Sequence, residues 1–557
     1  MVQKIVLYYQ GLQMFHKLER GACTTGLLLL GLIIILAGNP VHNLYATQSR
    51  TLGLIFRDSS ANAEGYTLFA PMNYNVTYLI DNNGMLVHSW PGSGLPGMAV
   101  YLCEDGLLLR TVQTSNPVFG NGGGIGGKIE LVDWDGNVVW SYIYSNTQHC
   151  QHHDAIRLPN GNVLLIAWEY KSRNEAVAAG RDPNLLIYNS LWPDHLIEID
   201  PRSDSIVWEW HVWDHLVQDY DSTKSNYGDP RQHPELIDLN FVSGLAVSDW
   251  NHSNGLAYNP ELDQIAVSVR QFSEVWVIDH STTREQAASH TGGRYGRGGD
   301  LLYRWGNPRV YRRDHTIGQT LFGQHDIQWI EPGLPGSGEM LVFNNGYGRT
   351  PWFSTVDQFV PPVDSPGFYH LGPDSAYGPA ELSWQFIGSP PESVYSSLIS
   401  GCQRLANGNT LICVGLSGVF YEVTPEGRIV WKYVNPVTRY GPQHQGDVLQ
   451  PAANSVFKIR RYPPDYPGLA GRQLNPVGPI EIYPQGTEEV DELRTQPAVI
   501  RGVLNYLAPD PAYLFDIAGR LHMKLKTGIN DVSHLPAGVY FLTTGIKSRR
   551  GMVVISR

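Results

Sequence analysis

The chain has 557 residues and a formal net charge of −12. Its 58 glycines and 37 prolines, together with 11% aromatic residues, favour many short strands joined by tight turns over a helical bundle. The acidic balance, which no basic run offsets, argues against a nucleic acid as partner. A chain of this length can bury a large core and should hold more than one structural unit.

The N-terminal region, residues 1–46, has the pattern of a secretory signal. Lys17 and Arg20 precede an apolar run, Leu27–Ala37, which is short for a membrane span. We expect cleavage between Gly38 and Ala46, so that the mature protein keeps no stable membrane span. The protein is then exported to the cell surface or the medium, or otherwise to the periplasm. An uncleaved anchor is the alternative.

A short phrase that ends in an aromatic strand recurs six times between residues 47 and 484. The copies are Met85–Trp90, Gly136–Tyr142, Ser205–Trp210, Asp300–Trp305, Glu381–Phe386 and Gly427–Tyr433. The intervals between them alternate apolar runs with Gly, Asn, Asp and Pro turns, as four-stranded meanders do. Six such units arranged radially make a six-bladed β-propeller, which hides its sheet edges between neighbouring blades. A large β-sandwich is the alternative.

The best-preserved unit runs from Gln151 to Trp210, and its first hairpin turns at Asn160-Gly161. Asn-Gly is the preferred sequence of a two-residue type I′ turn. The last unit repeats this hairpin around Asn407-Gly408, and two cysteines lie symmetrically about that turn. A two-residue turn would place Cys402 opposite Cys413, so either a disulfide or two buried free thiols is expected there.

Three units begin with a histidine at a matching position: His153, His252 and His325. The first strand of each propeller blade lines the central channel, so we expect these three side chains to converge at one end of it. His152 is the alternative to His153, because the units can also be aligned with a shift of one residue. The return strands end at Arg270 and Arg349 near the same rim. Histidines and arginines at one channel mouth would form an anion-binding site.

Over roughly residues 50–480 the chain resembles the bacterial arylsulfate sulfotransferases. The resemblance is carried by His252–Asn254, Ser268–Arg270, Gln324–Asp326, Asn345–Arg349 and Gln403–Thr410. It implies a six-bladed propeller that moves a sulfuryl group from an aryl sulfate to a phenol through a sulfated histidine. It also implies small-molecule partners only, with no nucleotide donor, no cofactor and no metal.

The resemblance assigns roles to particular residues and also exposes a departure. It implies that His252 and His325 are active-site histidines and that Arg349 binds the sulfate. The nucleophilic histidine should follow Arg349 in the last unit, where Ser400–Arg404 and Gly415–Val419 contain none. Either His153 or His252 has taken over as the nucleophile, or the enzyme works differently, or it no longer transfers sulfate. We therefore take His252, His325 and His153 as candidate catalytic residues, and Arg349, Arg270 and His152 as candidate substrate-binding residues.

The amino-acid composition of the chain changes after residue 484. Residues 485–497 form an acidic linker, and residues 498–557 contain short strands around turns, as in a small β-sandwich. This region resembles the C-terminal sorting domain of the type IX secretion system, through Asp516–Arg520, Gly528–Ser533 and Leu535–Tyr540. The resemblance implies a secretion machinery as partner, and then release or surface attachment.

Two other functions fit the same residues. A propeller without catalytic activity could hold an anionic or aromatic ligand at the cell surface. Alternatively, His153, His252 and His325 could bind a divalent metal, since three histidines can ligate zinc with one position open.

Overall fold

The computed structural model describes residues 50–242, 244 and 247–483, and residues 498–555 without 501–502, 507–511, 517–519, 527 and 545–549. The predicted signal region and the predicted linker lie outside the described residues. Strands dominate the described part, which has only two short α-helices, α1 (Arg173–Ala178) and α2 (Arg284–Ala287). None of its helices has the length and apolar character needed to cross a membrane.

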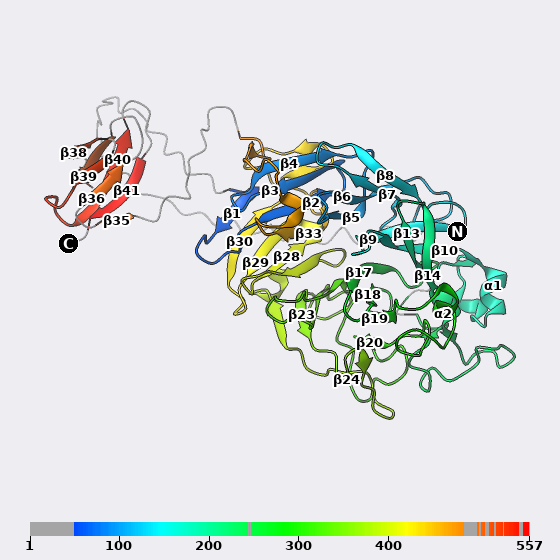
Figure 1. The fold of residues 1–557 in the computed structure, drawn as a ribbon. Helices are drawn as coiled ribbons and strands as arrows, with labels where there is room; N and C mark the ends of the chain where they lie inside the picture. Colours follow the sequence, from blue (N-terminus) through cyan, green and yellow to red (C-terminus); the bar gives the residue numbers. More distant parts are fainter. Residues whose placement is uncertain are drawn as a thin grey trace, which may run out of the picture. The chain divides into compact units, whose positions relative to one another are not determined.

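Six antiparallel sheets form a six-bladed propeller, as the repeat predicts (Figure 1). Blade 1 contains β33 (Val456–Tyr462), β2 (Tyr66–Pro71), β3 (Val76–Ile80) and β4 (Met85–Pro91). Blade 2 contains β5 (Pro96–Leu102), β6 (Leu108–Gln113), β7 (Gly127–Val132) and β8 (Val138–Ile143). Blade 3 contains β9 (His149–Arg157), β10 (Val163–Glu169), β13 (Asp194–Asp200) and β14 (Ser205–His211).

The other three blades follow the same order from the inner to the outer strand. Blade 4 contains β17 (Ser253–Asn259), β18 (Gln264–Val269), β19 (Glu274–Asp279) and β20 (Tyr303–Trp305). Blade 5 contains β21 (His325–Trp329), β22 (Met340–Asn344), β23 (Thr355–Phe359) and β26 (Trp384–Ile387). Blade 6 contains β27 (Gly401–Arg404), β28 (Thr410–Val414), β29 (Val419–Val423) and β30 (Ile429–Val434).

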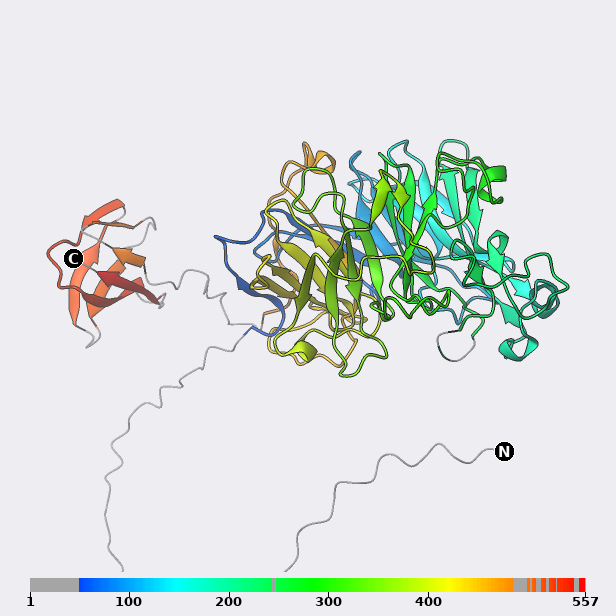
Figure 2. The same ribbon diagram turned by 90° about the horizontal axis from the view of Figure 1, so that it is seen from below.

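The inner strands contact one another in cyclic order, β33, β5, β9, β17, β21, β27 and again β33, so the ring closes. Both ends of the propeller sequence take part in the closure. Blade 1 receives its inner strand β33 from the end of the sequence, and blade 6 gains β1 (Gly53–Arg57) from the beginning as a fifth, outer strand. Figure 2 shows the blades from below, with their sheets packed one beside the next.

The repeated aromatic phrase contributes the fourth strand of every blade and fastens that blade to the next. In each copy one tryptophan donates its indole N–H to the connection between the third and fourth strands of the following blade. The pairs are Trp90 with Asp133 (3.1 Å), Trp140 with Asp204 (2.8 Å), Trp208 with Thr282 (3.1 Å), Trp305 with Pro379 (2.9 Å), Trp384 with Pro425 (2.6 Å) and Trp431 with Asn82 (2.9 Å). An indole that packs against the neighbouring blade needs such an acceptor, so the repeat preserves both the packing area and the hydrogen bond.

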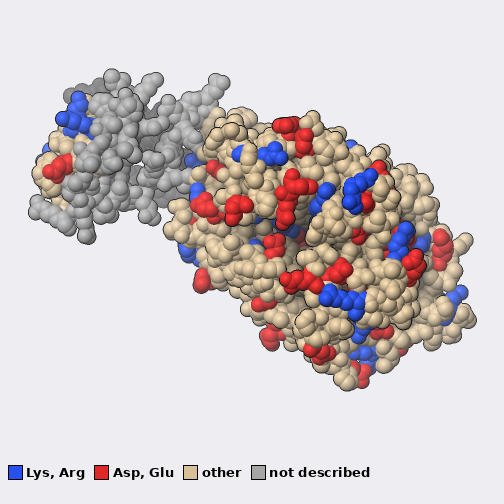
Figure 3. Space-filling view, viewed as in Figure 1, with Lys and Arg blue, Asp and Glu red and all other residues tan. Residues whose placement is uncertain are grey.

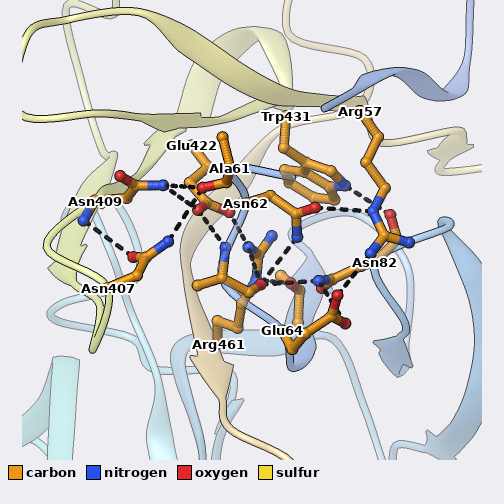
Figure 4. Close-up of polar contacts among 12 residues, drawn as sticks. Arg57, Ala61, Asn62, Glu64, Asn82, Asn407, Asn409, Glu422, Trp431 and Arg461 are labelled. Carbon is orange, nitrogen blue, oxygen red and sulfur yellow. Dashed lines mark hydrogen bonds and ion pairs between the residues drawn. The ribbon is translucent and has the colours of Figure 1, made fainter. Parts of the chain in front are cut away.

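A buried polar cluster fixes the start of the propeller sequence to blades 6 and 1 (Figure 4). Arg461 on β33 forms an ion pair with Glu422 on β29, and Glu422 also accepts the backbone N–H of Ala63 at 2.7 Å. Asn409 donates to Glu422 and to the carbonyl of Ala61, at 2.7 and 2.8 Å. These bonds tie the segment after β1 to both blades, so they hold the ring closed.

The two matching hairpins have three-residue loops, so the prediction of two-residue type I′ turns was wrong. In blade 6, Leu405 N–H donates to the carbonyl of Asn409 at 2.9 Å, and Gly408 occupies the left-handed region with φ 88°. In blade 3, Leu158 N–H donates to Asn162 at the same distance, with Gly161 at φ 87°. Asn-Gly is compatible with both loop lengths, and a three-residue loop ends with a left-handed residue, usually glycine.

This extra loop residue determines whether the two cysteines can form a disulfide. The blade 6 register pairs Cys402 with Ile412, and Gly401 with Cys413, so the two thiols face opposite sides of the sheet. Cys402 packs in the core between blades 5 and 6, and Cys413 in the core between blades 6 and 1. Both are buried and free, which excludes the disulfide and supports the alternative of two buried thiols.

The C-terminal region forms a five-stranded and a two-stranded sheet around a small apolar core, in agreement with the predicted β-sandwich. The larger sheet has the order β35 (Ala498–Ile500), β41 (Arg550–Ile555), β40 (Gly538–Thr544), β37 (Ala512–Asp516) and β38 (Leu521–Leu525). The smaller sheet pairs β36 (Val503–Tyr506) with β39 (Gly528–Asp531).

Candidate functional site

The inner strands of blades 2 to 5 each carry a β-bulge near their first residues. One residue in each bulge, or directly before it in blade 4, lies in the left-handed region: Met98, His153, His252 and Asp326, with φ values of 100°, 52°, 54° and 58°. This conformation is uncommon for residues other than glycine, and bulges re-aim side chains next to functional sites. Repeating the same irregularity around the ring therefore marks this end of the channel.

The structure brings the three predicted histidines together. The rings of His153 and His252 meet edge to face with centroids 4.6 Å apart. Phe457 on β33 packs near both His153 and His325, with ring centroids 5.9 and 6.3 Å away. Burial, followed by the nearby rings of His252, His152 and His325, lowers the pKa of His153 well below its usual value. His153 is therefore a neutral ring.

His252 is oriented by a buried carboxylate. Its Nδ1 lies 2.6 Å from Asp249 Oδ2, and the other carboxylate oxygen accepts the indole N–H of Trp168 at 2.8 Å. Burial opposes ionisation of Asp249, but His252 and the hydrogen bonds outweigh it and lower the pKa of this carboxyl. The ionised Asp249 therefore fixes the proton on Nδ1 and leaves a lone pair on Nε2. With 13% of its side chain exposed, His252 is also the most accessible of the three histidines.

His153 is backed by a carboxylate through a second histidine, His152. The Nδ1 atoms of the two rings are 2.8 Å apart, and His152 Nε2 lies 3.2 Å from Asp194 Oδ1. This contact is electrostatic and not a hydrogen bond, and the negative charge of Asp194 favours a proton on His152 Nε2, so that His152 Nδ1 accepts from His153 Nδ1–H. His153 then also presents an Nε2 lone pair. His152 itself stacks on Trp168, with a centroid distance of 4.0 Å, and points into blade 3.

His325 differs from the other two because protein groups occupy both of its ring nitrogens. Nδ1 lies 2.8 Å from Asn345 Oδ1, and Nε2 accepts the backbone N–H of Ile399 at 3.2 Å. The Asn345 amide nitrogen donates to the carbonyls of Ser396 and Ile399, which fixes its oxygen towards the ring. Burial and the charge of Arg270 lower the pKa of His325 to about 3. His325 is thus a neutral ring held in place.

Of the two predicted arginines, Arg270 is the one whose charge acts on the histidines. Its charge contributes to the lowered pKa values of both His153 and His325. The guanidinium lies over the ring of Tyr347, 5.1 Å from the centroid, and forms no ion pair within the described part of the chain. A half-buried guanidinium without a carboxylate partner can bind an oxyanion in the fixed geometry of its N–H groups.

Arg349 lies in a different environment. Its guanidinium is placed between the rings of Phe322 and Phe353, 5.0 and 4.6 Å from their centroids. Burial lowers the pKa of Arg349, while Asp357 is the nearby opposite charge that acts to raise it. The predicted role of Arg349 in sulfate binding stays a prediction.

A glycine run between β6 and β7 covers the histidines, and the sequence reasoning missed it. A Cβ on Gly123 would lie 2.9 Å from His252 Cε1, and one on Gly124 would lie 2.2 Å from His153 Cε1. A Cβ on Gly122 would lie 2.5 Å from the Trp168 ring. The backbone can approach these rings only because the three residues lack side chains. Three successive glycines outside an obvious turn were the signal that could have revealed this loop.

An ionic network fills the channel next to the histidines. Asp154 and Asp326, each following a site histidine, pair with Lys458 on β33 at 2.7 and 3.2 Å. Asp326 also accepts two hydrogen bonds from Arg460, at 2.7 and 3.0 Å, and Asp154 accepts the hydroxyl of Tyr101 at 3.0 Å. The four charged groups are buried, and Tyr101 is half-buried. Their opposite charges are paired with one another, so Arg270 remains available to an incoming anion.

The outer surface of the protein carries charges of both signs on the face that is drawn. On the face shown in Figure 3, Lys and Arg are interspersed with Asp and Glu and form no basic band.

Comparison with known protein families identifies the chain. The family model described as Arylsulfotransferase (ASST) matches residues 57–446. The chain belongs to the arylsulfotransferase family. Membership supports a sulfotransferase activity acting on small molecules, and the matched range covers all three site histidines and both arginines. No curated protein matches this arylsulfotransferase-family chain.

Solved structures resemble the chain only distantly. A protein of unknown function from Bacteroides caccae is 12% identical, with a TM-score of 0.39, over 72% of this chain and 99% of that one. A virginiamycin B lyase from Staphylococcus aureus is 10% identical, with a TM-score of 0.33, over 69% and 88% of the two chains. Likenesses this weak carry no argument about function, so the arylsulfotransferase assignment depends on the family match.

Proposed function

We propose that the protein transfers a sulfuryl group from an aryl sulfate to a phenol, with His252 as the nucleophile. The observation that carries this proposal is the Asp249–His252 pair, which leaves the Nε2 lone pair of His252 free in an accessible position. His252 then replaces the histidine that the last blade lacks. The last blade keeps the left-handed backbone conformation at its start, at Ile399 and Ser400 with φ values of 51° and 94°, but it has no histidine there.

In the first half-reaction, His252 Nε2 attacks the sulfur atom of the ester. An N–S bond forms while the bond between sulfur and the aryl oxygen breaks, and the aryloxide takes a proton from His153. Burial disfavours a charge on His153, but a bound sulfate ester supplies the negative charge that lets this ring hold a proton. Arg270 faces the charge on the sulfuryl oxygens, because transfer through a loose transition state is catalysed mainly by positioning and cations.

In the second half-reaction, the acceptor phenol gives its proton to His153 Nε2 and its oxygen attacks the sulfur. The N–S bond breaks, and its electron pair returns to His252. The His152–Asp194 pair supports the proton on His153 in both steps. Met98, Ile399 and Phe457 form a buried apolar cluster beside the histidines, which suits a planar aromatic substrate.

The assay uses a fluorogenic aryl sulfate and a phenol acceptor, and detects the sulfated acceptor by mass spectrometry. We expect His252→Asn to abolish transfer. The matched control is His370→Asn, because His370 also pairs through Nδ1 with a carboxylate, Asp364 at 2.8 Å, but is exposed. Folded wild-type protein that binds the ester without producing sulfated phenol would refute the transferase and favour a binding propeller.

We further propose that the protein is exported and that residues 498–557 serve as a secretion sorting domain. The support is the predicted signal in residues 1–46, together with the β-sandwich formed by the C-terminal region. Deleting residues 498–557 should trap active protein in the periplasm, as measured by fractionating cells. Unchanged export of the deleted form would refute the sorting role without affecting the proposed chemistry.

A further inference from the structure

A second group of histidines lies between blades 3 and 4, outside the proposed active site. His215 follows the short 3₁₀ turn Val212–Asp214, whereas His290 and Asp300 belong to the connection between α2 and β20. The Nδ1 atoms of His215 and His290 each lie 2.8 Å from the same oxygen, Asp300 Oδ1. Potential ligand atoms of the three residues all lie within 4.8 Å of one another.

The hydrogen bond at Nε2 of His215 determines which ring nitrogen carries the proton. His215 Nε2 lies 2.8 Å from the carbonyl oxygen of Ala287, which can only accept, so Nε2 carries a proton. In the neutral ring, Nδ1 is then a lone pair that faces a carboxylate oxygen. Two lone pairs at this distance repel each other unless a proton shared by the ring and the carboxyl group, or a metal ion, lies between or beside them.

The surroundings of His215 match those of a metal ligand. A ligating histidine usually donates its other ring N–H to a carbonyl or carboxylate, as His215 does to Ala287. The ring is buried and stacks on Trp210 with an interplanar angle of 6°, and Trp210 is itself held by the carbonyl of Gly299. A Cβ on Gly299 would lie 2.5 Å from His215 Nε2, so this close packing needs a glycine.

The site is also accessible from solvent. His290 is exposed over 60% of its side chain and lines a cleft of about 680 Å³, together with Trp213, Asp214 and His233. Water from the cleft can complete the coordination of an ion held by the three side chains.

We propose that His215, His290 and Asp300 bind a divalent transition-metal ion. With metal–ligand bonds of about 2.1 Å, a nitrogen–oxygen separation of 2.8 Å gives an angle of about 85° at the metal. This is close to octahedral geometry and well below the tetrahedral angle. Two imidazoles and one carboxylate, with open positions for water, suit ions such as Fe(II), Co(II) or Ni(II) better than Mg²⁺, which prefers oxygen ligands.

The test is a titration of untagged, chelator-treated protein with Ni²⁺ by calorimetry, with Mg²⁺ as the comparison ion. We expect one equivalent of Ni²⁺ to bind and Mg²⁺ to bind far more weakly. His290→Ala should weaken Ni²⁺ binding at least tenfold, and its exposed position lets the protein fold. His233→Ala is the matched control, because His233 lines the same cleft but pairs with Glu235, and binding should be unchanged.

A second variant guards against local misfolding. Asp300→Asn keeps the shape of the side chain and removes its charge, and it should also weaken Ni²⁺ binding at least tenfold. If wild-type protein binds no Ni²⁺, or if both variants bind it as tightly as wild type, the metal site is refuted. The contact between His215 and Asp300 is then an ordinary hydrogen bond. Neither result bears on the proposed sulfuryl transfer, which uses residues of the central channel.

Discussion

Replacing Asp249 by Asn tests how His252 is activated, and the structure predicts the orientation of the new amide. Trp168 Nε1 is only a donor, so the Asn oxygen must face it, as Asp249 Oδ1 does now at 2.8 Å. The amide NH₂ then faces His252 Nδ1, where the carboxylate now lies at 2.6 Å. Nδ1 becomes an acceptor, the proton moves to Nε2, and the attacking lone pair is lost.

The size of the effect follows from the comparable hydrolase arrangement, in which fixing the wrong histidine tautomer lowers kcat about 10⁴-fold. We expect a loss in kcat/KM of about 10³-fold, or about 4 kcal/mol in the activation barrier. KM should change little, because Asp249 does not contact the substrate. The assay is the rate of phenol sulfation from an aryl sulfate, measured on variants whose thermal unfolding matches that of the wild type.

A second substitution separates this explanation from simple damage to the site. In the double variant Asp249→Asn/Trp168→Phe, the indole donor is gone, so the amide can rotate its oxygen towards His252 and restore the productive tautomer. The double variant should therefore be more active than Asp249→Asn alone. If the single variant keeps wild-type kcat, or if removing Trp168 only lowers activity further, the reasoning is wrong.

Three other predictions concern the site loop, the pH dependence of stability and the cysteines. Gly123→Ala should lower kcat/KM about tenfold by displacing His252. The control is Gly318→Ala, where a Cβ meets nothing within 4 Å and kcat/KM should not change. Equal activities of the two variants would contradict the covering role of the loop. Burial opposes a charge on His280, but bonds to Asp263 and Glu198 outweigh it and raise the pKa to about 9. Because this value lies above the unfolded pKa of about 6.5, up to about 3 kcal/mol of stability is present below pH 6.5 and is lost as the pH rises through 9. Urea unfolding at several pH values should show this loss in wild type and not in His280→Gln. Cys103, Cys150, Cys402 and Cys413 should all react with a thiol reagent in denaturant without prior reduction, and a mass change of two on reduction would contradict the blade 6 register.

The sequence was sufficient for the architecture because the fold repeats its signal. Every blade keeps a tryptophan on its fourth strand, at one of two positions that lie two residues apart, and its indole N–H bonds to the following blade. Histidines at matching positions could likewise be predicted to converge, as His153 and His252 do at 4.6 Å. Because each repeat forms one blade, residues at matching positions in different repeats lie at matching positions around the ring.

Other features depend on contacts that no local pattern encodes. The loop length at Asn407-Gly408 could not be read from the sequence, because Asn-Gly suits turns of two and of three residues. A difference of one residue in the loop moves the side chain of Cys413 to the other face of the sheet. The division of roles among the histidines was equally hidden. Asp249 stands only three positions before His252, but Ile399, whose N–H bonds to Nε2 of His325, lies 74 positions after that histidine.

The most direct test of the account is to identify the residue that carries the sulfuryl group. Protein mixed with an aryl sulfate without acceptor is quenched under alkaline conditions, digested and mapped by mass spectrometry. We predict a sulfated peptide containing His252, modified on the imidazole, which disappears when phenol is added before the quench. A label on His153, on His325 or outside the channel would contradict His252 as the nucleophile.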